Sequence, residues 1–181
     1  MKNRITTFAT IMILFLGGSS LLAQKFEQPV LISSAGQSAD VKLVKMLAQR
    51  QGLNATTVLM ARPADLTGFK TLVIVPGFSS KGLVAAGISQ QDEMEIVQTL
   101  IKAANDLKIP IVLMHIGGNA RRQGQSDSFN QLVADNSKQM LVVKQGDEDG
   151  FFSNIAKSKN IPLTLVEKIA DSAEPLGNLF K

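Results

Sequence analysis

The sequence has no cysteine, tryptophan or tyrosine, and its 181 residues include a single histidine, His115. The missing cysteine excludes disulfides, thiol catalysis and cysteine-bound metals. One imidazole without histidine partners does not indicate a zinc site, and no dinucleotide-binding glycine motif is present. Without tryptophan and tyrosine, few aromatic side chains are left on which nucleic-acid bases could stack. The sequence therefore predicts no metal, no cofactor and no nucleic-acid partner.

The first 23 residues contain no acidic residue. They begin with Lys2 and Arg4, continue with an apolar stretch over 5–16 and end in small residues up to Ala23. This layout is typical of a secretory signal peptide, and the apolar stretch is short for a membrane span. We expect cleavage between Ala23 and Gln24, with Ser20 as a second cleavage position. A retained N-terminal anchor is the alternative interpretation.

Positive charge is also scarce once that segment is removed. The formal charge of the whole sequence is +4, and loss of Lys2 and Arg4 leaves +2, because 17 basic and 15 acidic residues remain. That excess is too small for a nucleic-acid-binding surface. We expect one periplasmic or secreted domain over residues 24–181, with no stable membrane insertion after cleavage.

Six short apolar runs alternate with segments of helical periodicity. The runs are "PVLIS" (29–33), "TTVLM" (56–60), "TLVIV" (71–75), "PIVLM" (110–114), "MLVV" (140–143) and "PLTLV" (162–166). Continuous apolar runs are typical of parallel strands that are covered on both faces. The pattern predicts a doubly wound α/β fold: three layers around a mostly parallel sheet of five to six strands, in the order 2-1-3-4-5-6. Ile74 and Leu113 should be fully buried.

Glycine, serine and charged residues are concentrated in the loops that follow the strands. These loops include "SSAGQSAD" (33–40), "PGFSSKG" (76–82) and "HIGGNARRQGQSD" (115–127), whereas the loops that enter the strands are plainer. In open parallel sheets, ligands bind at the carboxyl ends of the strands. The sequence therefore predicts a binding site at that edge.

Hydroxyls, backbone amides and guanidinium groups in these loops favour a small anionic ligand. The residues expected to contact it are Ser34, Gly36, Gln37, Ser38, Ser80, Lys81, Gly117, Gly118, Arg121 and Arg122. Simpler roles exist for several of the polar residues. Ser34 or Ser38 could cap a helix, as could Ser126 with Asp127 and Asp147 with Asp149, and the arginines could be solvated.

Two further functions stay open at this stage. His115 could act as the general base of a hydrolase or transferase, with Ser79 or Ser34 as the nucleophile. However, "GFSSKG" lacks the spacing of a nucleophile elbow, and a lone histidine after a strand is often structural. The third candidate is a protein interaction module. The sequence does not decide whether the protein is an enzyme.

The stretches "PVLISSAGQSADV", "GFSSKGLVAAGI", "MHIGGNARRQGQSD", "VVKQGDEDGFF" and "IPLTLVEKI" together resemble an uncharacterised family of exported bacterial α/β domains, a domain of unknown function. The resemblance spans nearly the whole mature chain. It implies an intact α/β domain and assigns no catalytic residue. The layout is also similar to flavodoxin-like and Rossmann-like folds, but by analogy of architecture only.

Overall fold

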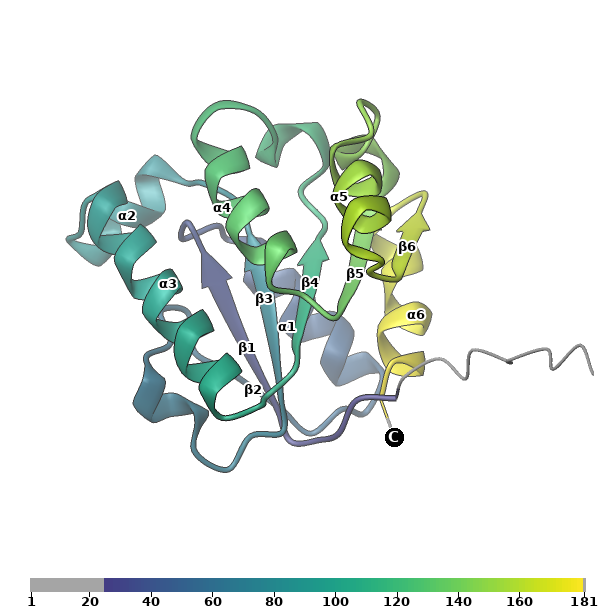
Figure 1. Ribbon diagram of the computed structural model, residues 1–181, viewed down its shortest axis with the longest axis horizontal. Coiled ribbons are helices and arrows are strands. Elements are labelled where there is room, and N and C mark those ends of the chain that lie inside the picture. Colours follow the sequence, from purple (N-terminus) through teal and green to yellow (C-terminus); the bar gives the residue numbers. More distant parts are fainter. Residues whose placement is uncertain (1–24, 181) are drawn as a thin grey trace, which may run out of the picture.

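The computed structural model describes residues 25–180, which form a six-stranded, all-parallel sheet in the order β2-β1-β3-β4-β5-β6 (Figure 1). The strands are β1 (Val30–Ala35), β2 (Ala55–Thr57), β3 (Thr71–Pro76), β4 (Ile111–His115), β5 (Gln139–Val143) and β6 (Leu163–Val166). The predicted fold class and strand order are confirmed. The predicted signal peptide, residues 1–23, lies outside the described residues.

The connections between strands carry the helices. These are α1 (Asp40–Arg50), α2 (Ser80–Ala86), α3 (Gln90–Asp106), α4 (Gly124–Asp135), α5 (Phe151–Lys159) and α6 (Ala173–Asn178), with short 3₁₀ turns η1 (Pro63–Leu66), η2 (Gly118–Arg121), η3 (Lys144–Gly146) and η4 (Ile169–Ser172). Helix α3 begins with a capping box, in which the Ser89 hydroxyl accepts from the Asp92 amide and the Asp92 carboxylate accepts from the Ser89 amide. None of the helices in residues 25–180 is long and apolar enough to cross a membrane.

The sheet separates two core layers (Figure 1). One layer packs the sheet against α3, α4 and α5, and the other packs it against α1 and α6. Side chains along each strand alternate between these layers, as the pleat of a β-strand requires. Ile74 and Leu113 are fully buried in the first layer, which confirms the prediction for both.

Strand β2 is shorter than the apolar run "TTVLM" (56–60) suggested, because it ends at Thr57. Backbone bonds to β1 continue through Val58 and Leu59, and the chain turns at residues 59–60. At this turn the Ser33 hydroxyl donates to the Leu59 carbonyl (3.4 Å) and accepts from the Ala61 amide (3.2 Å). The short connection from β2 to β3 then contains only η1, in agreement with the expectation that any helix there is short.

Candidate functional site

The loops after β1 and β3 are joined side by side at the carboxyl edge of the sheet. The Gly77 amide donates to the Ala35 carbonyl and the Ser79 amide donates to the Gly36 carbonyl, both at 2.8 Å. An isolated antiparallel bridge pairs Gln37 with Phe78. The two loops that the sequence placed at this edge therefore form one connected surface.

Two glycines allow this close approach. A Cβ atom on Gly36 would lie 2.6 Å from the Gly77 carbonyl oxygen, and one on Gly82 would lie 2.2 Å from the Gln37 carbonyl oxygen. Both neighbours are backbone atoms of the protein. Gly36, one of the residues that we expected to contact a ligand, lets one loop approach the other.

A buried carboxylate on α3 holds the loop after β1. Glu93 accepts hydrogen bonds from the Gly36 amide and from the Gln37 side-chain amide, both at 2.9 Å. Burial raises the pKa of Glu93, and these two hydrogen bonds oppose the increase. Glu93 was not among the site residues predicted from the sequence. Its position four residues before Val97, on the apolar stripe of α3, is the signal that could have found it.

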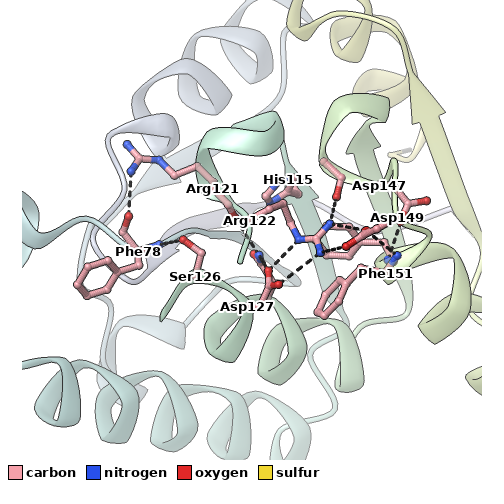
Figure 2. A network of polar contacts seen from close by, with 12 residues as sticks. Phe78, His115, Arg121, Arg122, Ser126, Asp127, Asp147, Asp149 and Phe151 are labelled. Atoms are coloured by element: carbon pink, nitrogen blue, oxygen red, sulfur yellow. Dashed lines mark hydrogen bonds and ion pairs between the residues drawn. The ribbon is translucent and has the colours of Figure 1, made fainter. Parts of the chain in front are cut away.

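Arg121 lies against three segments at this edge, and Figure 2 shows its bond to the Phe78 carbonyl. Its Nη1 donates to the Phe78 carbonyl oxygen (2.8 Å), and its Nε lies 3.4 Å from Oδ2 of Asp40. Its aliphatic stem lies against Gly77 and Gly117, where added Cβ atoms would come within 3.0 and 2.1 Å of it. The side chain is 26% exposed, and Nη2 makes no hydrogen bond within residues 25–180. One face of this guanidinium is therefore available to a ligand.

Arg122 points the other way and is paired with acidic side chains (Figure 2). Its Nε donates to Asp127 (2.8 Å), its Nη1 and Nη2 donate to both oxygens of Asp149 (3.0 and 2.8 Å), and Nη1 also donates to the Gly146 carbonyl. The guanidinium carbon lies 4.3 Å from the ring centre of Phe151, and only 5% of the side chain is exposed. We expected Arg122 to face a ligand, but every guanidinium nitrogen already has a protein partner.

These pairings change the acidity of the groups involved. The hydrogen bonds from Arg122 and from the Phe151 amide lower the pKa of Asp149 to about 2. Burial opposes the charge on Arg122, but the hydrogen bonds to Asp149 and Asp127 prevail and raise its pKa. All three groups are charged at neutral pH. Two carboxylates against one guanidinium leave this part of the edge with a net negative charge.

The helix caps at this edge agree only in part with expectation. Asp147 accepts from the amides of Phe152 (2.6 Å) and Ser153 (3.1 Å), so it caps α5 as predicted, and Asp149 adds a bond from the Phe151 amide. The predicted cap of α4 by Ser126 and Asp127 is wrong, because α4 begins earlier, at Gly124. Ser126 instead accepts from the Phe78 amide (3.1 Å), while Asp127 binds Arg122.

His115 is fully buried at the end of β4. Its Nε2 donates to the Gly118 carbonyl oxygen (3.2 Å), and its ring centre lies 4.9 Å from that of Phe152. Burial lowers the pKa of His115 to about 4, against the weaker opposing effect of the Gly118 carbonyl. The histidine is therefore neutral at physiological pH.

A family model for a domain of unknown function matches residues 27–180, nearly the whole described chain. The chain belongs to the DUF6305 family. No curated protein matches the sequence. The SGNH-hydrolase family esterase AlinE4 shares 14% identity over 87% of this chain and 84% of its own, with a TM-score of 0.30. A GDSL-like lipase from Bacteroides thetaiotaomicron shares 11% identity over 75% of this chain and 66% of its own, with a TM-score of 0.34.

In this DUF6305 chain, the serines proposed as nucleophiles are not bonded to the histidine. Ser34 pairs in register with Val75, a residue of the layer beneath α1, whereas His115 pairs with Val142, which belongs to the opposite layer. Paired residues of neighbouring strands share a face, so Ser34 and His115 lie on opposite faces of the sheet. The Ser79 hydroxyl accepts from the Gly82 amide (3.1 Å) and caps α2. No Ser–His hydrogen bond occurs among the described residues.

The remaining candidate residues of the DUF6305 chain divide by exposure. Ser38 is buried, and its hydroxyl accepts from the amide of Asp40, the first residue of α1 (3.2 Å). The N-cap of α1 is Ala39, however, so the predicted serine cap of this helix is wrong. Gly118 lies against Gln145. Ser80 and Lys81 are exposed in the first turn of α2 and line a shallow hollow of about 340 Å³ with Val84 and Ala85. Residues 25–180 contain no cluster of three or more possible metal ligands. At this edge, Arg121 and Lys81 are the predicted cationic contacts that remain accessible.

Proposed function

We propose that this DUF6305 chain is an exported, non-catalytic domain that binds a small anionic ligand at the carboxyl edge of its sheet. The observation that carries the proposal is the state of Arg121. Its guanidinium is fixed by the Phe78 carbonyl and by Asp40, yet it is partly exposed and keeps Nη2 without a partner in the described chain. A fixed guanidinium with free donors is suited to a carboxylate or phosphate, because little side-chain entropy is lost on binding.

Lys81 is the second cationic contact in the proposal. It is exposed, and it forms no ion pair with any residue in the range 25–180. Gly82, the next residue, lies directly against Gln37, so α2 begins beside the loop after β1. Arg122 is left out of the proposed site because Asp127 and Asp149 already neutralise it.

The environment of His115 supports binding rather than catalysis. A general base needs a pKa near the working pH and a proton within hydrogen-bond reach. His115 is buried, its pKa is lowered to about 4, and its Nε2 is already bonded to the Gly118 carbonyl. A base with these properties is poorly suited to activate a serine at neutral pH.

Calorimetric titration of the purified protein with inorganic phosphate and with small mono- and dicarboxylates tests the proposal. Arg121→Gln and Lys81→Ala should each weaken binding about tenfold, the loss expected for one charge-assisted hydrogen bond. Binding should also weaken as salt is added. Lys45→Ala, on the exposed side of α1, is the matched control and should bind like wild type. Absence of binding by wild type, or equal binding by all variants, would contradict an anion site.

The interaction module is the second candidate, and α2 provides the observation that favours it. Val84 is 81% exposed and lies beside Ala85 in the hollow next to Lys81. Adjacent exposed apolar side chains that form one patch can mark a protein contact, and Val84 and Ala85 line the same hollow. A photo-crosslinking amino acid at Val84 should then give a discrete adduct in the native host, whereas the same group at Lys45 should not.

A further inference from the structure

A large hollow lies at the opposite edge of the sheet from the proposed anion site. It measures about 610 Å³ and lies among the N-terminal segment, the turn before β3 and the connection from α3 to β4. In Figure 1 these segments are at the bottom, where the strands begin. Its size is within the range of small-molecule sites. The sequence predicted no site at this edge, because the loops that enter the strands are plainer than those that leave them.

Apolar side chains form the floor of this hollow. Leu66 is buried in the core beneath it, and Phe69 and Ile109 are partly buried against the same core layer. Leu107, at the end of α3, is 60% exposed. The floor is therefore a continuation of the hydrophobic core that reaches solvent, and covering Leu107 would remove apolar surface from water.

Lysines form the rim. Lys25, Lys70 and Lys108 line the hollow and Glu27 is the one carboxylate among its described lining residues, so the formal charge is +3 − 1 = +2. Lys138 and Lys108 line an adjoining hollow of about 350 Å³. Lys25 donates to the Asn178 carbonyl, but none of these lysines forms an ion pair within residues 25–180.

The helix dipole explains only some of the lysines on this rim. Lys108 and Lys138 follow the ends of α3 and α4, where a cation compensates the helix dipole. Lys70 precedes β3 and follows no α-helix, and Lys25 belongs to the N-terminal segment. The helix dipole also gives no reason for exposed Leu107 beside the lysines. An apolar floor with a cationic rim is complementary to a ligand that has both an apolar body and an anionic group.

We propose that this hollow binds an amphipathic organic anion. The apolar body of the ligand lies on Leu107, Phe69 and Ile109, and its carboxylate, sulfonate or phosphate group lies between Lys70 and Lys108. This inference does not depend on the anion site at the carboxyl edge, because it uses none of the same residues.

The test is a fluorescence titration of the purified protein with anilinonaphthalene sulfonate, an aromatic sulfonate whose emission increases in apolar surroundings. Wild type should bind one dye per chain in a saturable manner. The neutral analogue phenylnaphthylamine, which lacks the sulfonate, should bind at least about tenfold more weakly, which corresponds to the loss of one charge-assisted contact. Inorganic phosphate alone should not displace the dye, because it has no apolar body.

Variants locate the dye. The double variant Lys70→Ala/Lys108→Ala should lose about tenfold or more in dye affinity, and Leu107→Gln should lose affinity for the dye and for its neutral analogue alike. The matched control is Lys42→Ala/Lys45→Ala, which removes two exposed lysines of α1 that do not line the hollow. Its dye affinity should equal that of wild type.

Mapping of amide chemical shifts in the wild-type protein keeps the test decisive even if a variant fails to fold. Binding should shift the amides of Gly68, Phe69 and Leu107. Shifts confined to Gly77 and Lys81 at the other edge would overturn the proposal. So would equal loss of affinity in the α1 control, equal affinity for the neutral analogue, or no saturable binding.

Discussion

The guanidinium of Arg122 and the carboxylate of Asp149 form a two-pronged ion pair, with N–O distances of 3.0 and 2.8 Å (Figure 2). Arg122 belongs to the loop after β4 and Asp149 to the loop after β5, so the pair joins two loops through residues that are 27 positions apart in the sequence. Asp127, from the first turn of α4, accepts from the same guanidinium. The stretch after β4 is therefore rich in polar residues largely because it fastens this edge of the sheet.

Arg122→Ala should destabilise the fold by about 3 kcal/mol, because it leaves Asp127 without its ion partner and removes a side chain that is 95% covered. Asp149→Asn should cost less than about 1 kcal/mol, since Asp149 is 58% exposed and water can replace its contacts. Urea unfolding of both variants measures the difference. Equal losses would contradict the view that the buried guanidinium is the centre of this network.

Gly82→Ala should destabilise the protein by more than about 1 kcal/mol, although alanine is usually the better helix residue. Gly82 lies in α2, and its added Cβ would come within 2.2 Å of the Gln37 carbonyl oxygen, a backbone atom that cannot move without disturbing the loop after β1. Gly177→Ala in α6 is the matched control, because its Cβ would meet only the end of the exposed Gln51 side chain. That variant should be neutral or slightly more stable. Thermal unfolding of both variants shows whether each one is less or more stable than wild type.

His115 should make stability depend on pH in the window between about 6.5 and 4. Burial lowers the pKa of the folded-state imidazole from 6.5 to about 4. The unfolded chain therefore takes up a proton in this window while the folded chain does not, and stability falls as the pH falls. The loss is about 1.4 kcal/mol per pH unit and roughly 3 kcal/mol at most.

The comparison that isolates this effect is wild type against His115→Gln, with the free energy of unfolding measured at several pH values. The variant should lose the slope between pH 6.5 and 4. Asp149, with its pKa lowered to about 2, contributes mainly below this window. Glu93, whose pKa is raised, is present in both proteins and so cancels in the difference. An unchanged slope in the variant would mean that His115 is not the group responsible.

The strands could be predicted from the sequence because each one is marked by an apolar run within its own segment. A continuous apolar run such as "PIVLM" is favourable only where both faces are covered, and this local requirement predicts a parallel sheet between helix layers. The strand order was predicted from the doubly wound arrangement. β2 was predicted too long because the chain turns at residues 59–60, and the Ser33 hydroxyl that bonds this turn belongs to another strand.

The partners of the site residues could not be predicted in the same way. Adjacent Arg121 and Arg122 look equivalent in the sequence, yet one lies across Gly77 and Gly117 and the other is bound between Asp127 and Asp149. Which acid each arginine meets depends on how separate loops pack at the sheet edge. The pattern of residues within a single segment gives no information about which acid each arginine contacts.

Export remains a prediction from residues 1–23. The mature protein from its native host should begin at Gln24, because Ala23 ends a segment with the layout of a signal peptide. Intact-mass measurement of the soluble extracytoplasmic fraction checks this directly. Cleavage after Ser20 would correct the position only, whereas a full-length mass in the membrane fraction would favour the retained anchor.

Gly117→Ala should impair anion binding through Arg121. The backbone angles of Gly117 (φ −78°, ψ −3°) suit any residue, so the substitution does not strain the chain itself. Its Cβ, however, would lie 2.1 Å from Cγ of Arg121 and 2.5 Å from Oδ2 of Asp40, so the arginine must leave its position. Phosphate affinity should fall about as much as in Arg121→Gln, roughly tenfold.

The stability of Gly117→Ala separates this indirect effect from simple unfolding. Arg121 is partly exposed and can find water, so the free energy of unfolding should fall by only about 1–2 kcal/mol. Gly177→Ala, remote in the fold on α6, should leave phosphate binding unchanged. If Gly117→Ala lost stability but kept full phosphate affinity, the fixed position of Arg121 would not matter for binding, and the anion site would have to rest on Lys81 alone.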